Sequence, residues 1–212
     1  MVFLEQKQSM QQLFSIAAEF YKFPDRDFYN QLASGDLFQE LEKLSTKAGF
    51  APSNLAWPVS VPSLHQLQQE HLRCFMGFNS QAAVPIESLY KRWTVDPTAK
   101  LTIASQKGYL MGDAAVHIHY LLDSLGLEIP SEYQQKPDHL AILLEILAYL
   151  ITERNEREVE LYISEHLDWL PHLKLRLIEI DAHPLFVTMT EQLIHMTAQA
   201  KWLYKDTEAI CY

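Results

Sequence analysis

The feature that most constrains the fold of this chain is an apolar run from Leu140 to Ile151, in which only Glu145 and Tyr149 carry polar groups. A helix that is apolar around its whole circumference belongs in a protein interior, because a single packing face could not cover it. At about 1.5 Å per residue this helix would be roughly 20 Å long, too short to cross a bilayer. The run therefore predicts a central, buried helix.

The few polar residues at this helix are candidates for function. Pro137 suits the entry to a helix, and Asp138 can accept hydrogen bonds from the free N–H groups of the first turn. Asp138 and Glu145 are separated by about two helical turns, so both carboxylates lie on one stripe. We expect Glu145 to face a partner such as an arginine or a tyrosine, because a lone buried charge is unfavourable. For Asp138, a capping role and a ligand-binding role are compatible, and both stay open.

The rest of the sequence predicts more helices and no strands. Only 6 glycines occur and apolar residues make up 48% of the chain, a balance that favours helix over sheet. Ser63 and Gln66 predict a capping box, and Gly126 followed by Leu127 predicts a Schellman-type helix end. Two further helices are expected over residues 86–94 and 105–125.

The predicted fold class is all-α, a bundle of about nine to eleven helices. Residues 126–137 form a polar linker with two prolines and are the predicted hinge. The predicted division is an N-terminal helical subdomain over 1–125, the hinge linker over 126–137, and a C-terminal helical subdomain over 138–212.

Charge and cysteine content narrow the class of partner. The formal net charge is −10, with 27 acidic and 17 basic side chains. This sign argues against nucleic acid and favours basic ligands. The two cysteines, Cys74 and Cys211, show neither a zinc spacing nor a disulfide framework. Residues 1–20 have the pattern of an amphipathic helix rather than of a signal peptide. We expect a reduced, cytoplasmic protein without integral membrane association.

Familiar metal and nucleotide motifs are absent from the sequence. No histidine follows a glutamate by three residues, as a ferritin-like diiron site requires, and no P-loop is present. His117 and His119 would point about 200° apart on one helix and could not chelate one ion from it. We therefore expect no metal ligand and no catalytic residue. Two alternatives are kept: a generic helical adaptor, and a small helical metal-dependent hydrolase that uses His117, His119, Asp138 and His139.

A second polar group of residues lies between Pro85 and Trp93. At helical spacing Glu87 and Tyr90 share one face, and Leu89 and Trp93 share another. On the residues alone, the apolar pair would be core and Glu87 would complement the helix dipole.

Several short motifs occur in a fixed order over roughly residues 14–203. They are Leu72-Arg73-Cys74-Phe75-Met76-Gly77, Pro85-Ile86-Glu87-Ser88-Leu89-Tyr90, Pro137-Asp138-His139-Leu140 and Glu165-His166-Leu167 with Trp169 and Pro171. Together they resemble the TorD/DmsD family of redox-enzyme maturation chaperones. Cys74 and Ile86 depart from the family pattern in a region thought to help set client choice, so the client stays open.

The resemblance implies an all-helical cytoplasmic chaperone with no cofactor and no enzyme activity. Such proteins bind the twin-arginine signal peptide of a molybdopterin oxidoreductase precursor, hold the precursor for cofactor insertion and prevent premature export. Two guanidinium groups call for carboxylates beside an apolar groove. His139 is either a satisfied core histidine or part of this site. The expected peptide-binding residues are the acceptors Glu87, Asp138 and Glu145 and the groove walls Leu89, Tyr90, Trp93 and His139.

Overall fold

The computed structural model describes residues 4–53, 56–58, 60–77 and 82–205. As predicted, the fold is all-α: the described residues form ten α-helices and one 3₁₀ helix, and no strand. The elements are α1 (Leu4–Glu19), α2 (Arg26–Ser34), α3 (Asp36–Lys47), α4 (Leu64–Phe75), α5 (Glu87–Tyr90), α6 (Asp113–Leu125), η1 (Ser131–Tyr133), α7 (Leu140–Glu153), α8 (Glu156–His166), α9 (Leu170–Glu179) and α10 (Pro184–Lys205).

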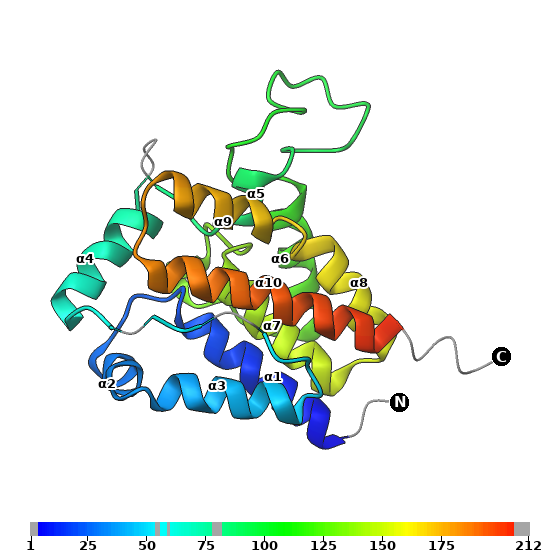
Figure 1. Ribbon diagram of the computed structural model, residues 1–212. Coiled ribbons are helices and arrows are strands. Elements are labelled where there is room, and N and C mark those ends of the chain that lie inside the picture. Colours follow the sequence, from blue (N-terminus) through cyan, green and yellow to red (C-terminus); the bar gives the residue numbers. More distant parts are fainter. Residues whose placement is uncertain (1–3, 54–55, 59, 78–81, 206–212) are drawn as a thin grey trace.

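Helix α7 lies in the middle of the bundle (Figure 1). Ten of its fourteen residues are buried, which confirms the prediction of a central helix that is apolar on every side. Helix α1 packs along α7, and α3 covers α1, while α8 and α9 pack against α10. One hydrophobic core runs through these helices. The ends of α7 are therefore held from several directions, and side chains at its N-terminus have fixed positions.

Two helix ends follow the predicted chemistry. Ser63 and Gln66 form the capping box of α4, each side chain accepting from the other's backbone N–H. Gly126 ends α6 in the left-handed region at φ 66°, and the N–H of Leu127 donates to the Leu122 carbonyl at 3.0 Å. Glycine is suited to this position because it has no Cβ to clash there.

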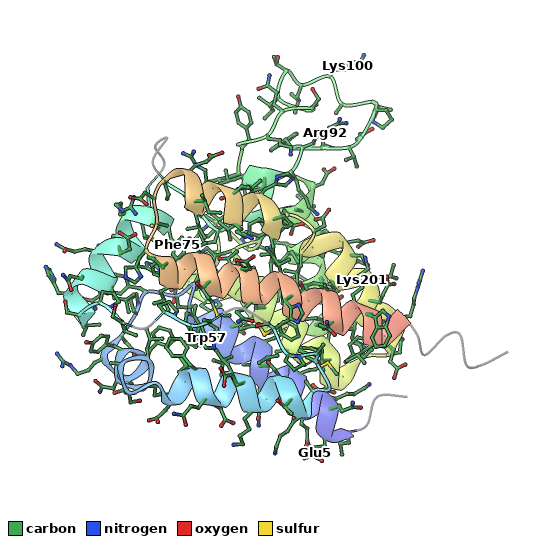
Figure 2. The ribbon with its side chains drawn as sticks, in the orientation of Figure 1. Glu5, Trp57, Phe75, Arg92, Lys100 and Lys201 are labelled. Carbon is green, nitrogen blue, oxygen red and sulfur yellow. The ribbon has the colours of Figure 1, made fainter. Side chains whose placement is uncertain are left out.

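The helices expected over residues 86–94 and 105–125 are both shorter in the structure. Helix α5 has only four residues, α6 begins at Asp113, and the chain between them, residues 91–112, forms a loop. Figure 1 shows this loop projecting beyond the helices, and Figure 2 labels Arg92 and Lys100 on it. Gly108 takes φ 90° and Met111 takes φ 58°, both outside the helical region, so the start of the second expected range is not helical.

Trp93 closes the base of this loop through its backbone. Its N–H donates to the Gln106 carbonyl at 2.8 Å, and its carbonyl accepts from the N–H of Asp113 at 2.8 Å. A Cβ on Gly112 would lie 2.6 Å from the same carbonyl oxygen, so the close approach requires glycine. The loop thus satisfies backbone groups that a longer helix would otherwise have paired.

The segment between α6 and α7 contains η1 and a polar stretch. Helix α1, in the predicted N-terminal subdomain, packs along α7, in the predicted C-terminal one. The division at residues 126–137 and its role as a hinge stay predictions.

Among the described residues, no helix is long and apolar enough to span a membrane.

Truncation of a buried side chain of α7 should strongly destabilise the protein. Leu143 is fully buried, so we expect Leu143→Ala to lower the free energy of unfolding by about 2–5 kcal/mol through lost burial and a residual cavity. Urea unfolding followed by circular dichroism measures this change. Leu175→Ala on α9 is the matched control, because Leu175 is 56% exposed and should change stability by less than about 1 kcal/mol. Equal effects would contradict the central role of α7.

Candidate functional site

The backbone brings two of the sequence motifs together. Ile86 and His139 form an isolated antiparallel bridge. The N–H of Glu87 donates to the Asp138 carbonyl at 3.1 Å, and the N–H of Leu140 donates to the Pro85 carbonyl at 2.8 Å. The start of α5 is therefore fixed against the start of α7. This contact places the predicted acids Glu87 and Asp138 beside each other.

Asp138 is fully buried and supports α5 rather than α7. Its Oδ2 accepts from the backbone N–H of Ser88 at 2.7 Å and from the Ser88 hydroxyl. Burial raises the pKa of this carboxyl, and the neighbouring charge of Glu87 raises it further, against the hydrogen bonds from Ser88. Asp138 is thus a buried acceptor at the first turn of α5.

His139, not Asp138, caps α7. The Nδ1 atom of His139 accepts from the N–H of Ala141 at 3.2 Å. Of the two roles that the sequence left open for Asp138, the capping of this helix is not found, because the Asp138 side chain turns away to Ser88. His139 is also buried, so its imidazole is a satisfied cap within the fold.

Glu87 lies at the centre of a charged network. It is fully buried, and its Oε2 lies 2.9 Å from Nδ1 of His166 at the end of α8. Its Oε1 lies 2.8 Å from Nζ of Lys91, whose ammonium also contacts Asp168 at 2.7 Å. Burial opposes the charge on Lys91, but the carboxylates of Glu87 and Asp168 raise the pKa of its ammonium. The buried Glu87 charge is therefore compensated on both oxygens.

A cavity of about 520 Å³ opens beside this network. Tyr90 and Trp169 stack there with ring centroids 4.9 Å apart, and the Trp169 indole N–H donates to the His166 carbonyl at 2.8 Å. The cavity combines acids, bases and aromatic rings from α5, α6, α8 and α9. Its charged and aromatic lining residues are Glu87, Tyr90, Lys91, Arg92, Lys107, Asp113, His117, Glu165, His166, Asp168, Trp169 and His172.

Leu89 and Trp93 do not line this cavity. Leu89 and Leu110 pack against a small apolar cluster that contains Ile86. The Trp93 indole N–H donates to the Leu110 carbonyl at 3.1 Å. Both side chains therefore support the base of the 91–112 loop.

His139 and Glu145 belong to a different face of the molecule. His139 lines a second cavity of about 390 Å³, together with His71 and Lys22. Glu145 is partly exposed and forms an ion pair with Lys22, which also pairs with Glu19. Glu145 has a charged partner, as expected, but that partner is a lysine. The seven predicted site residues are thus distributed over two cavities and the protein interior.

The hydrolase set is not assembled. Asp138 accepts hydrogen bonds from Ser88, His139 lines the second cavity, and His117 lies against His166, with its Nδ1 2.9 Å from Nε2 of that ring.

Sequence reasoning missed Lys91, His166 and Asp168 as neighbours of Glu87. The His166 motif and the short spacing of Lys91 after Glu87 were signals for two of them, since residues four apart meet on a helix.

The comparisons with known proteins agree on one family. Residues 35–182 match the family described as nitrate reductase delta subunit. The Shewanella pealeana protein named Chaperone protein TorD is 24% identical over 199 residues, covering 90% of this chain and 87% of the relative. Two proteins of the same name are 22% identical over 187 residues in Salmonella arizonae and 28% identical over 133 residues in Vibrio cholerae. These alignments cover 84% of this chain and 83% of the relative in the first case, and 57% and 54% in the second.

Two substitutions of Asp138 should separate its contribution as a hydrogen-bond acceptor from that of its charge. Asp138→Ala leaves the buried N–H of Ser88 without its acceptor, so we expect a loss of about 1–3 kcal/mol in the free energy of unfolding. Asp138→Asn keeps an oxygen acceptor and removes a buried charge, so it should lose much less. Urea unfolding of both variants measures the difference. Asp123→Ala, at an exposed position of α6, is the control, and equal losses for the Ala and Asn variants at position 138 would contradict this role.

Acid should destabilise the fold through two buried histidines. Burial lowers the pKa of His71 to about 4 and that of His139 to about 3, with the charge of Lys136 adding to both. Because the unfolded chain binds these protons near pH 6.5, stability is full above that pH and falls as the pH drops towards the folded values.

From pH 7.5 to pH 5, each of these histidines should remove about 2 kcal/mol from the free energy of unfolding. Urea midpoints at the two pH values measure the loss. His139→Asn keeps a capping side chain and should reduce the pH dependence, while His65→Asn on the exposed face of α4 should not. An unchanged dependence in the first variant would exclude His139 as a source.

Proposed function

Because this chain belongs to the TorD/DmsD family of redox-enzyme maturation chaperones, we propose that it binds the twin-arginine signal peptide of a molybdopterin oxidoreductase precursor in the cytoplasm. In this role it holds the precursor until the cofactor is inserted and prevents premature export. Curated relatives carry the name of a chaperone, which supports a binding protein rather than an enzyme.

The observation that carries the site is the position of Lys91. Its ammonium lies between the carboxylates of Glu87 and Asp168, at the wall of the 520 Å³ cavity. The chain's own cation thus occupies a place with two acidic partners. An arginine from a bound peptide has the same charge and a planar fork that pairs with carboxylates through two parallel hydrogen bonds. In the proposal, this guanidinium displaces Lys91 and pairs with the two acids.

The surroundings suit the rest of such a peptide. Tyr90 is half-buried and stacks on the buried Trp169 at the wall of the same cavity, so the Tyr90 ring is the aromatic surface that a guanidinium can contact. The exposed carboxylates of Glu165 and of Asp113, whose Oδ2 also accepts from the N–H of Val95 at 2.8 Å, line the cavity and can receive a second arginine. A formal net charge of −10 speeds encounter with a basic segment.

An apolar strip continues from the cavity along α6. Val116 is 60% exposed and Tyr120 is 73% exposed, and the two are four residues apart on the helix. Asp113, three residues before Val116, lines the cavity, so the strip begins at its edge. The apolar stretch that follows the arginines in such a signal would lie on this strip as a helix.

The seven residues predicted from the sequence have different roles in such a complex. Glu87 and Tyr90 belong to the peptide site, and Asp138 acts through Ser88 by holding α5 in place. Leu89 and Trp93 support the loop behind the site. His139 lies at the second cavity, and Glu145 pairs with Lys22 at its wall. Both residues act on stability in this proposal, without touching the arginines.

Calorimetry with synthetic peptides tests the proposal. A twin-arginine leader peptide should bind the full chain with one site, and its Lys-Lys counterpart should bind at least about tenfold more weakly, because an ammonium cannot form the paired hydrogen bonds. Glu87→Gln and Asp168→Asn should each lower the affinity for the twin-arginine peptide by about tenfold or more. Lys91→Met should raise this affinity, because no internal cation then has to be displaced.

Glu40→Gln on α3 is the matched control, since that acid is half-buried and lies outside the cavity. Circular dichroism verifies that each variant is folded. Equal affinity for both peptides and for all variants would remove the proposed site and favour the generic helical adaptor.

A further inference from the structure

We infer that His117, Glu165 and His166 form a binding site for one divalent transition-metal ion of the zinc type. Within the described part of the chain, these three residues are the one group of His, Cys, Asp or Glu side chains close enough to share an ion. One ligand atom from each lies within 4.8 Å of the others. The inference does not rest on the proposed peptide site, and it names a ligand that the family's chaperone role does not require.

The two imidazoles already have nearly the spacing that a metal imposes. Nε2 of His166, on α8, lies 2.9 Å from Nδ1 of His117, on α6. Two nitrogens bound to a tetrahedral zinc ion at about 2.0–2.1 Å are roughly 3.3 Å apart. The two ring nitrogens therefore need to separate by only a few tenths of an ångström, and the exposed Glu165 side chain moves in to complete the site. The ion would replace the proton that the two ring nitrogens now share.

Glu87 orients His166 for this purpose. Its Oε2 lies 2.9 Å from Nδ1 of His166. The ring can therefore donate its Nδ1–H to the carboxylate in a hydrogen bond and present the lone pair of Nε2 to the ion. A carboxylate behind a histidine ligand fixes the ring and raises its basicity. Glu87 is fully buried and cannot turn away freely, because Lys91 holds its other oxygen.

The electrostatics favour a cation at this place. Four acids line the cavity, Glu87, Asp113, Glu165 and Asp168, against the three bases Lys91, Arg92 and Lys107. The carboxylates of Glu87 and Glu165 are the ones that lie beside the two rings. Two nitrogens and one oxygen suit zinc, cobalt or nickel, whereas calcium and magnesium prefer oxygen ligands alone.

The site is open on one side. His117 and Glu165 are exposed, and all three residues line the 520 Å³ cavity. Three protein ligands therefore leave a fourth position to water or to a group that enters the cavity. Sequence reasoning missed the site because His119 offered itself as the partner of His117 from the same helix, while the true neighbour is 49 residues away.

Cobalt titration of the full-length protein tests this site. One equivalent of Co²⁺ should produce the visible absorption of a four-coordinate ion, and one equivalent of Zn²⁺ should remove it. His117→Ala should weaken binding at least about tenfold, and Glu87→Gln should weaken it by about 10–100-fold through the ring that it orients. His117 is exposed, so its loss should leave the fold intact, as a thermal melt can verify.

Two histidine variants are the matched controls. His119→Ala removes the half-buried histidine of the same helix, and His172→Ala removes an exposed histidine that lines the same cavity. Neither should change the affinity. The inference is overturned if Co²⁺ fails to bind with one-to-one stoichiometry, if His117→Ala binds as tightly as the unmodified chain, or if the controls lose as much as His117→Ala. Peptide titrations carried out with a chelator present test the proposed function separately.

Discussion

The hydrogen bonds that Ser88 donates to the buried carboxylate of Asp138 join α5 to the start of α7. A helix of four residues has almost no stability of its own, because nucleation fixes several residues for few bonds. Helix α5 is therefore positioned by its neighbour, and its neighbour is the most deeply buried helix of the bundle. The charged network depends on this junction through Glu87 and Lys91, which are carried by α5 and the residue after it.

The junction places two acids together in the interior, which is unfavourable without compensation. Asp138 obtains it from neutral donors on Ser88, and Glu87 obtains it from Lys91 and His166. The difference decides what each acid can do. A carboxylate held by the N–H and hydroxyl of a buried serine is fixed, whereas one paired with a flexible lysine can exchange that partner for another cation.

Sequence reasoning reached the elements and part of the site. The apolar run predicted a buried central helix, and the motifs around Glu87 and Asp138 predicted two acids in one region. It could not decide that the Asp138 side chain turns to Ser88 while His139 caps α7, because both residues can act as caps. It also placed helix over most of the 91–112 loop, where backbone bonds of Trp93 replace helical ones.

The pairing of His166 with His117 lay beyond sequence reasoning for a different reason. Helical periodicity gives the face on which a residue lies, but the partner of that face depends on how two helices pack. Here α6 and α8 meet so that one cavity combines a lysine held by two acids with two adjacent imidazoles. Both features draw on the negative charge of Glu87. A guanidinium that takes the place of Lys91 and a metal ion at the imidazoles would share this charge, so each weakens the attraction left for the other.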